Sequence, residues 1–177
     1  MNHADHVNLL RASVQPGDTW ADIGSGTGAF TLALADLLGP GGSIVAVDRD
    51  PGVLADNAAA LAERFPSVEL RIVDADFTDE LDLPVLDGLV AANSLHFVPR
   101  ERQAGVVRTL ATHLRPGGTF VVVEYDADHG NPWVPYPFRF DSWVSMAARA
   151  GLVETRRLGH APSRFLGGIY SAVARRP

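Results

Sequence analysis

The chain has 177 residues, of which 46% are hydrophobic and 20% are charged, with a formal net charge of −6. This composition is typical of one globular domain with a sizeable core, and the acidic balance argues against a nucleic-acid backbone as the main partner. The sequence has no cysteine, which excludes disulfides, thiolate metal sites and cysteine nucleophiles; all 15 basic residues are arginine, which excludes Schiff-base chemistry and a P-loop lysine.

No segment of the sequence is typical of a membrane protein or a secreted protein. The longest apolar runs are far shorter than a membrane span, and the polar start of the chain, MNHADHVNLL, does not resemble a signal peptide. Together with the lack of cysteine, these features predict a single cytoplasmic domain over residues 1–177, with no membrane span and no nucleic acid as a partner; they leave the oligomeric state open.

Helical and strand patterns alternate along the sequence, separated by turns rich in glycine and proline. Val7, Leu10 and Val14 share one face of the first helix, whereas Asp50 and Pro51 are placed to cap and begin the third. The predicted elements are, in chain order, a helix over residues 3–14, a strand over 19–24, a helix over 28–38, a strand over 43–48, a helix over 50–65, strands over 68–76 and 86–93, a helix over 99–114, an RPGG turn over 115–118, a strand over 119–126, a helix over 141–151, and strands over 152–159 and 167–176.

Continuous apolar strands that alternate with helices indicate a parallel sheet covered on both faces. The last two strands are close enough in the sequence to pair as an antiparallel unit. We therefore predict an α/β, Rossmann-like, doubly wound fold: a mostly parallel seven-stranded sheet with an antiparallel last strand and helices on both faces. Ligands of such folds bind at the carboxyl ends of the strands.

The stretch ADIGSGTGAF, residues 21–30, is predicted to form a strand end, a turn and the start of a helix, and its glycines allow bare backbone to approach a ligand closely. Gly24, Gly26 and Ala29 also satisfy the dinucleotide fingerprint G-x-G-x-x-A, and a structural turn without a ligand is a further alternative. Asp22 favours a ligand without a phosphate, since a carboxylate opposes a pyrophosphate and suits an ammonium group.

Two further strand ends carry carboxylates that suit a nucleoside. Asp48 ends the second strand about 20 residues after the glycines, where it could hold ribose hydroxyls. VDAD ends the third strand and places Asp74 and Ala75 where a carboxylate and a backbone N–H could meet an adenine edge.

Together these motifs resemble those of the class I S-adenosylmethionine-dependent methyltransferases. Within that family, the sequence most resembles the group of quinone-biosynthesis and related small-molecule methyltransferases. The resemblance runs over nearly the whole chain. The segments that carry it are, in order, DIGSGTG, VDRD, VDAD, NSLHFV and LRPGGTFVVVEYD. Val73 departs from the family's pattern, in which glycine often precedes the Asp-Ala pair.

The resemblance implies S-adenosyl-L-methionine as the cofactor and a small molecule as the methyl acceptor. The positions that it implies are Asp22, Gly24 and Gly26 around the methionine part, Asp48 at the ribose hydroxyls, Asp74 with Ala75 at the adenine, and Asn93 near the methionine moiety or the transferring methyl. Ser25, Gly28 and Arg49, from the same two loops, complete the predicted cofactor-binding set.

Methyl transfer from a sulfonium needs a base only when the acceptor must lose a proton. The candidate bases are His6, His96, His129, Tyr125 and Tyr136, each of which could instead be a packed or surface residue. We predict His96, Tyr125 and Tyr136 as catalytic residues. The stretch SLHFV resembles the LHH found at this place in many small-molecule methyltransferases, with Phe97 in place of the second histidine.

The segment 125–140 is rich in proline and aromatic residues and cannot run as a regular helix or strand. We expect it to close the acceptor pocket as a lid, together with the N-terminal helix of residues 1–16; alternatively, its rings fill the core. It includes DADH, residues 126–129, but the spacing is not distinctive of a metal site and no metal is expected.

The charges are distributed unevenly. Residues 1–138 hold 8 arginines and 19 acidic residues, whereas residues 139–177 hold 7 arginines and 2 acidic residues. The basic C-terminal region is interpreted either as a solvated face or as a patch that meets an anionic acceptor or partner.

Two other functions are compatible with the same motifs. An NAD(P)-dependent oxidoreductase would use the glycine loop, although Asp22 and the lack of an evident Ser-Tyr-Lys centre count against it. A non-catalytic S-adenosylmethionine-binding subunit or regulator would keep the loop without needing any catalytic residue.

Overall fold

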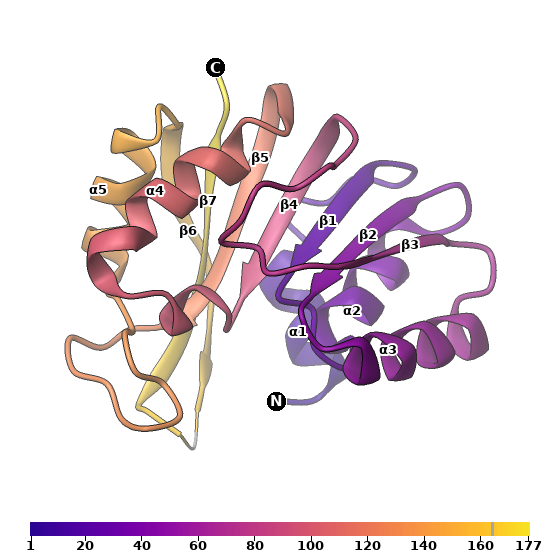
Figure 1. The fold of residues 1–177 in the computed structure, drawn as a ribbon, viewed down its shortest axis with the longest axis horizontal. Coiled ribbons are helices and arrows are strands. Elements are labelled where there is room, and N and C mark those ends of the chain that lie inside the picture. Colours follow the sequence, from indigo (N-terminus) through magenta and orange to yellow (C-terminus); the bar gives the residue numbers. More distant parts are fainter. Residues whose placement is uncertain (164) are drawn as a thin grey trace.

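Seven strands pair into one sheet in the computed structural model, which describes residues 1–163 and 165–177 (Figure 1). Their order is β3-β2-β1-β4-β5-β7-β6, and β7 is antiparallel to both of its neighbours, whereas the other pairs are parallel. This confirms the predicted Rossmann-like sheet with its antiparallel last strand. The strands are β1 Thr19–Ile23, β2 Ser43–Asp48, β3 Glu69–Asp74, β4 Leu86–Ala92, β5 Leu114–Tyr125, β6 Val153–Pro162 and β7 Gly168–Arg175.

Helices cover both faces of the sheet. Residues of α1, α2 and α3 form one core with the first face, and residues of α4 and α5 form a second core with the other (Figure 1). No helix in the described part of the chain has the length and apolar character needed to cross a bilayer. The helices are α1 His3–Leu10, α2 Ala29–Leu38, α3 Pro51–Arg64, α4 Arg100–Ala111 and α5 Phe140–Arg149, with a short 3₁₀ helix, η1, at Leu95–Phe97.

The two cores follow from the alternation of side chains along each strand. In β1, Ala21 and Ile23 face α4 and α5, whereas Trp20 packs on the side of α1 and α2. Two carboxylates interrupt this apolar pattern, Asp22 in β1 and Glu124 in β5, and both are almost fully buried. Because an unpaired buried carboxylate is costly, each needs a specific partner.

The element boundaries agree with the predictions to within three residues except at two places. Helix α1 ends at Leu10 rather than at Val14, because residues 11–13 tighten into a turn in which Ser13 N–H donates to the Leu10 carbonyl. Val14 is nevertheless buried, as expected. The predicted cap of α3 is confirmed, since the Asp50 carboxylate accepts hydrogen bonds from the N–H groups of Gly52 and Val53.

The second difference is the RPGG stretch, predicted as a turn before a strand that starts at residue 119. Strand β5 instead begins at Leu114, and residues 115–118 bulge out between the pairs Leu86–Leu114 and Gly88–Thr119. Gly117 takes a left-handed φ of 76° and donates its N–H to the carbonyl of Arg176, which fixes the bulge to the C-terminal end of the chain. The glycine still makes the bend, but within the strand.

Candidate active site

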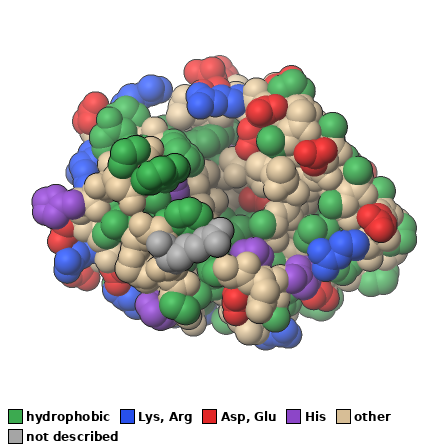
Figure 2. Space-filling view, turned by 90° about the horizontal axis from the view of Figure 1, so that it is seen from below, with side chains coloured by type: hydrophobic (Ala, Val, Ile, Leu, Met, Phe, Trp, Pro, Cys, Tyr) green, Lys and Arg blue, Asp and Glu red, His purple; other side chains and the backbone are tan. Residues whose placement is uncertain are grey.

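A cavity of about 610 Å³ opens at the carboxyl ends of β1 to β4, and Figure 2 shows the molecule hollowed on this face. Parallel α/β sheets bind ligands at this edge, between the loops that follow the strands. The walls are formed by residues 24–27 after β1, Ala29 and Phe30 at the start of α2, residues 48–49 after β2, residues 75–78 after β3, residues 92–94 and 97–99 after β4, His6 of α1 and Arg102 of α4.

The glycine loop brings its backbone to the cavity without side chains in the way. Gly24 and Gly26 have left-handed φ angles of 72° and 51°. A Cβ on Gly24 would lie 2.5 Å from the Cβ of Ser94, so only glycine fits between β1 and the end of β4. A Cβ on Gly26 would meet no described atom within 4 Å, and this residue lines the cavity. Gly28 does not line the cavity; its missing Cβ makes room for Asn57 of α3.

Asp48 is held at the cavity wall by two backbone donors. One carboxylate oxygen accepts a hydrogen bond from Gly26 N–H at 2.9 Å, and the other accepts one from Asp50 N–H at 3.1 Å. A carboxylate offers about four lone-pair sites. Each oxygen of Asp48 therefore keeps capacity for one further donor, an arrangement that suits two neighbouring hydroxyl groups.

The end of β3 differs in detail from the sequence prediction. Ala75 lines the cavity, but its N–H donates to the Asp48 carbonyl at 3.0 Å and so does not point to a ligand. Asp74 is exposed and does not line the cavity, whereas Asp76 does. The Asp76 carboxylate accepts a hydrogen bond from Thr78 N–H at 2.9 Å and pairs with Arg49 at 3.6 Å; the hydrogen bond is the largest cause that lowers the pKa of Asp76.

Three buried side-chain oxygens at the cavity have no hydrogen-bond partner among the described residues. They belong to Ser25 in the glycine loop and to Asn93 and Ser94 at the end of β4. Asn93 also has a left-handed φ of 53°, a strained conformation for a residue other than glycine. Buried polar groups are normally paired, so these oxygens are the donor or acceptor sites that a bound polar ligand would satisfy.

Asp22 lies behind the glycine loop rather than in the cavity wall. Its carboxylate accepts a 2.7 Å hydrogen bond from the Thr31 hydroxyl, and the Asn57 amide donates to the same hydroxyl at 2.9 Å. Burial raises the pKa of Asp22 from 3.8 to about 7, against the lowering effect of the Thr31 hydrogen bond. The carboxyl group can therefore gain or lose a proton near neutral pH.

A model of the methyltransferase domain family matches residues 21–120, which is more than half of the chain. The chain belongs to this family. The match begins in β1, at the glycine loop, and ends in β5, so it covers the four strands whose carboxyl ends form the cavity.

Curated relatives of this methyltransferase domain are longer than the chain itself. The ubiquinone/menaquinone biosynthesis C-methyltransferase UbiE of Ectopseudomonas mendocina is 30% identical over 68% of this chain and 46% of its own length. The carboxy-S-adenosyl-L-methionine synthase of Chromohalobacter salexigens is 34% identical over 58% of this chain and 38% of its own length. The chain thus spans less than half the length of these two relatives.

Solved structures share the fold of the methyltransferase domain. The 1,6-didemethyltoxoflavin-N1-methyltransferase of Burkholderia thailandensis, solved with 1,6-didemethyltoxoflavin and S-adenosylhomocysteine bound, superposes with a TM-score of 0.76 at 21% identity, over 98% of this chain and 77% of that one. Identity at this level establishes the fold alone. The family model and the relatives confirm the predicted membership of the class I S-adenosylmethionine-dependent methyltransferase family, and the solved structure confirms its fold.

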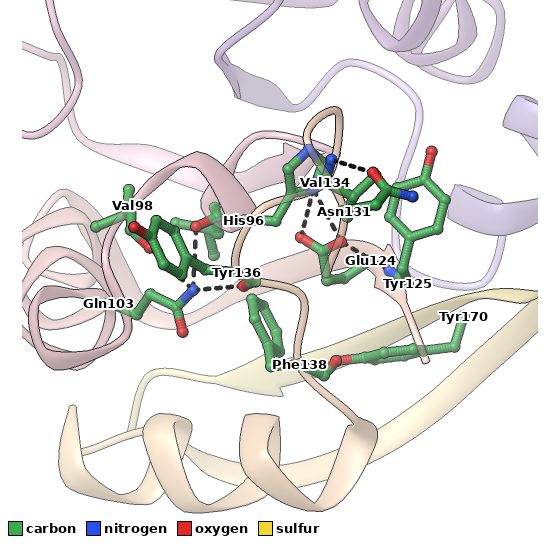
Figure 3. Close-up of polar contacts among 11 residues, drawn as sticks. His96, Val98, Gln103, Glu124, Tyr125, Asn131, Val134, Tyr136, Phe138 and Tyr170 are labelled. Carbon is green, nitrogen blue, oxygen red and sulfur yellow. Dashed lines mark hydrogen bonds and ion pairs between the residues drawn. The ribbon is translucent and has the colours of Figure 1, made fainter. Parts of the chain in front are cut away.

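The predicted catalytic residue His96 of this methyltransferase domain lies next to the cavity but not in its wall. It is buried, and its Nδ1 contacts both oxygens of Glu124, at 3.0 and 3.1 Å (Figure 3). One of these oxygens also accepts a hydrogen bond from Tyr125 N–H. Glu124 thus has the partners that its burial requires. The ring of Phe97, 4.4 Å from that of His96, is 59% exposed and does line the cavity.

The other predicted catalytic residues and His129 lie outside the cavity wall. Tyr125 is buried on the face of α1 and α2, and burial raises the pKa of its hydroxyl. His129 is exposed. Tyr136 lies beside η1, where its N–H donates to the His96 carbonyl and its own carbonyl accepts from the Gln103 amide (Figure 3).

The proline-rich segment 125–140 divides into buried and exposed rings. Phe138 is buried, and its carbonyl accepts a hydrogen bond from the Tyr170 hydroxyl, whereas Trp133 is 71% exposed. No residue of the segment lines the cavity, although α1, the other part of the predicted lid, supplies His6. The alternative prediction, that the rings of this segment fill the core, therefore holds for Phe138 but not for Trp133.

The acidic residues of the DADH stretch pair with arginines of the basic C-terminal region. Asp126 contacts Arg157 at 3.0 Å and Asp128 contacts Arg139 at 2.8 Å, while Arg175 pairs with Glu154. Arg164 lies outside the described residues. Among the residues that the structure describes, no group of three or more His, Asp or Glu side chains lies together as the ligands of a metal ion would.

Sequence reasoning missed several residues of the site. Asp76, Ser94 and Arg102 line the cavity without having been assigned to it. Asp76 is the last residue of the VDAD motif. The motif therefore indicated a carboxylate at this strand end, but the prediction assigned Asp74, two residues earlier. Thr31 and Asn57, which hold Asp22, lie inside helices whose apolar pattern gave no indication of a polar contact.

Proposed function

We propose that this methyltransferase domain transfers a methyl group from S-adenosyl-L-methionine to a small molecule. The observation that carries the proposal is the set of unpartnered buried oxygens of Ser25, Asn93 and Ser94, which lie at a cavity between a glycine loop and Asp48. The cavity volume of about 610 Å³ is in the range of small-molecule sites.

In this proposal the donor lies along the carboxyl ends of β1 to β4. The free lone pairs of Asp48 accept hydrogen bonds from the two ribose hydroxyls, and residues 75–78 surround the adenine. Asp76 replaces Asp74 as the carboxylate at the adenine end, because Asp74 lies outside the cavity. Ser25, Asn93 and Ser94 contact the amino-acid end.

Asp22 acts on the amino-acid end from behind the glycine loop. Its charged form is disfavoured by burial, and a positively charged ammonium group on the other side of the loop would stabilise that form. Donor binding is therefore coupled to loss of a proton from Asp22 near neutral pH. The hydrogen bond from Thr31, whose hydroxyl accepts from the Asn57 amide, keeps the carboxylate in place.

The bound donor supplies an electrophilic methyl group on a positively charged sulfur. The task of the protein is therefore to orient the acceptor for in-line attack and to exclude water. His96, predicted as a catalytic residue, could act as a base only through Nε2, because Glu124 holds its Nδ1 and its Nε2 has no hydrogen-bond partner among the described residues. It would need Phe97 to move before it could reach an acceptor in the cavity.

A screen of metabolites as acceptors, with release of S-adenosylhomocysteine as the readout, tests the proposed function. We expect at least one small molecule to give release that depends on both substrates and is lost in Asp48→Ala. Tight donor binding without release from any acceptor would instead support the non-catalytic binding function.

The proposal includes the cytoplasmic location and the small-molecule acceptor expected from the sequence, with nucleic acid excluded as an acceptor. Fractionation of cells that express the full natural protein tests the location. Adding DNA or RNA to the release assay tests the acceptor class, and methylation of either polymer at the rate of the best small molecule would contradict it.

A further inference from the structure

His6 is the histidine among the ionisable side chains in the described cavity wall. Asp48 is held by backbone donors, and Asp76 pairs with Arg49. The His6 ring has no hydrogen bond or ion pair with any residue that the structure describes, yet it lies in the cavity wall. His6 therefore has a free ring nitrogen and lies in the cavity wall, whereas His96 and His129 do not line the cavity.

Helix α1 holds His6 in a fixed place. Asn2 and Asp5 form a capping box at its start, and His3 contacts Asp36 of α2 at 3.1 Å. The helix packs on α2, β6 and β7, away from the adenine end at β3. The His6 ring lies 4.7 Å from that of Phe30, in the first turn of α2 directly after the glycine loop. His6 therefore adjoins the part of the site where the methionine end of the donor is proposed to lie.

The surroundings of His6 favour its neutral form. Burial lowers the pKa of its imidazole, and the N-terminal ammonium group and His3 lower it further, whereas Asp5 raises it. Arg49 and Arg102 are the cationic groups in the cavity wall, and Asp48 and Asp76 are the anionic ones. At neutral pH a ring of this kind accepts a proton rather than donating one.

We propose that His6 is the proton acceptor of the methyl-transfer site, and that the methyl acceptor is a small molecule that loses a proton from an O–H or N–H group as it is methylated. This inference rests on the proposed function. The acceptor's oxygen or nitrogen forms a bond to the methyl carbon while the carbon–sulfur bond breaks, and the electron pair of that bond stays on sulfur as a neutral thioether. The acceptor's proton passes to the free ring nitrogen of His6 and then to water.

The difference in charge between two ligands tests the position of His6 without a known acceptor. S-adenosyl-L-methionine carries one positive charge on sulfur that S-adenosylhomocysteine lacks. We expect the pKa of His6, followed by NMR of the imidazole, to be lower in the first complex than in the second by about 0.5 or more. Signals are assigned with the variant His6→Gln, and the exposed His129 serves as an internal control that should show no difference.

An equal His6 pKa in the two complexes would overturn the inference, because the ring would then lie far from the reacting sulfur. If neither ligand binds, the proposed function itself is contradicted, and this outcome is distinct from binding without a pKa difference.

Turnover with an acceptor from the screen tests the role of His6 as a base. His6→Gln should lower kcat by about 100-fold or more and remove the acid limb of its pH profile, with donor affinity unchanged. His3→Gln, a matched change on the same helix outside the cavity, should leave both intact. Wild-type turnover with the same acid limb in His6→Gln would overturn the role.

Discussion

The donor half of the cavity and its acceptor half are built in different ways. The proposed donor half consists of loops that follow β1 to β4, and its carboxylate Asp48 is fixed by backbone hydrogen bonds from Gly26 and Asp50. The proposed acceptor half joins a side chain of α1 with side chains of η1 and α4, which lie far from α1 in the sequence. The contrast indicates that the donor site depends on backbone geometry and the acceptor site on individual side chains.

The largest combined effect on donor affinity and stability is expected from Gly24→Ala, because a Cβ there would overlap the Cβ of Ser94 at 2.5 Å. We expect donor affinity to fall by at least about tenfold and the free energy of unfolding to fall by more than the ~1–2 kcal/mol of left-handed strain. Isothermal titration and urea unfolding measure the two quantities.

Gly41→Ala is the matched control, since Gly41 also has a left-handed φ but open space around its missing Cβ. Its free energy of unfolding should fall only by the cost of left-handed strain, and its donor affinity should be normal. Equal losses in the two variants would contradict the close fit between the glycine loop and β4.

Asp48→Ala should weaken donor binding by roughly 1.5–3 kcal/mol, the scale of hydrogen bonds to a charged group. Asp50→Ala should instead lower the stability by about 1 kcal/mol through loss of the α3 cap, while leaving donor affinity nearly unchanged. If Asp48→Ala loses stability but keeps its affinity, then Asp48 only supports the turn.

Asp22 should make the stability of the free protein depend on pH. Its pKa is raised from 3.8 to about 7 in the folded state, so between these values the folded protein holds a proton that the unfolded chain has lost. The contribution of Asp22 to the free energy of unfolding is therefore complete below about pH 4 and falls by up to about 1.4 kcal/mol per pH unit toward pH 7.

Unfolding of wild type and Asp22→Asn at pH 5, 6.5 and 8 measures this dependence. The variant should gain stability relative to wild type as the pH rises, whereas Asp56→Asn, at an exposed position on α3, should not. A constant difference between Asp22→Asn and wild type at all three values would show that Asp22 does not titrate in this range.

The smallest effect on stability is expected at Trp133, whose side chain is 71% exposed. Trp133→Ala should change the free energy of unfolding by no more than about 0.5 kcal/mol and leave donor affinity unchanged. If the segment 125–140 closes over the acceptor, turnover should fall in this variant. Phe138→Ala is the buried comparison from the same segment, and it should lower the free energy of unfolding by about 3–5 kcal/mol. Full turnover in Trp133→Ala would contradict the lid.

The same contrast explains what could be predicted from the sequence. The fold and the donor loops follow from local patterns: apolar strands, the glycines at positive φ, and Asp48 at a strand end each depend on residues close in the chain. The exclusion of Asp74 and Ala75 N–H from the cavity could not be predicted, because it depends on the register of β3 against β2 and on the hydrogen bond from Ala75 to Asp48.

Contacts between segments distant in the chain could likewise not be predicted from the sequence. His96 matched a family motif, yet the motif does not show that Glu124 and Phe97 enclose its ring. His6 was one candidate base among five, and only the packing of α1 on α2 brings it to the cavity wall. Such placements depend on tertiary packing, which short motifs do not encode.

Calorimetric titration of the protein with S-adenosyl-L-methionine, S-adenosylhomocysteine and NAD tests the donor site most directly. The geometry of the glycine loop, Asp48 and the unpartnered oxygens of Ser25, Asn93 and Ser94 predicts saturable binding of both adenosyl compounds and none of NAD. Tight binding of NAD, with no response to either adenosyl compound, would contradict the account.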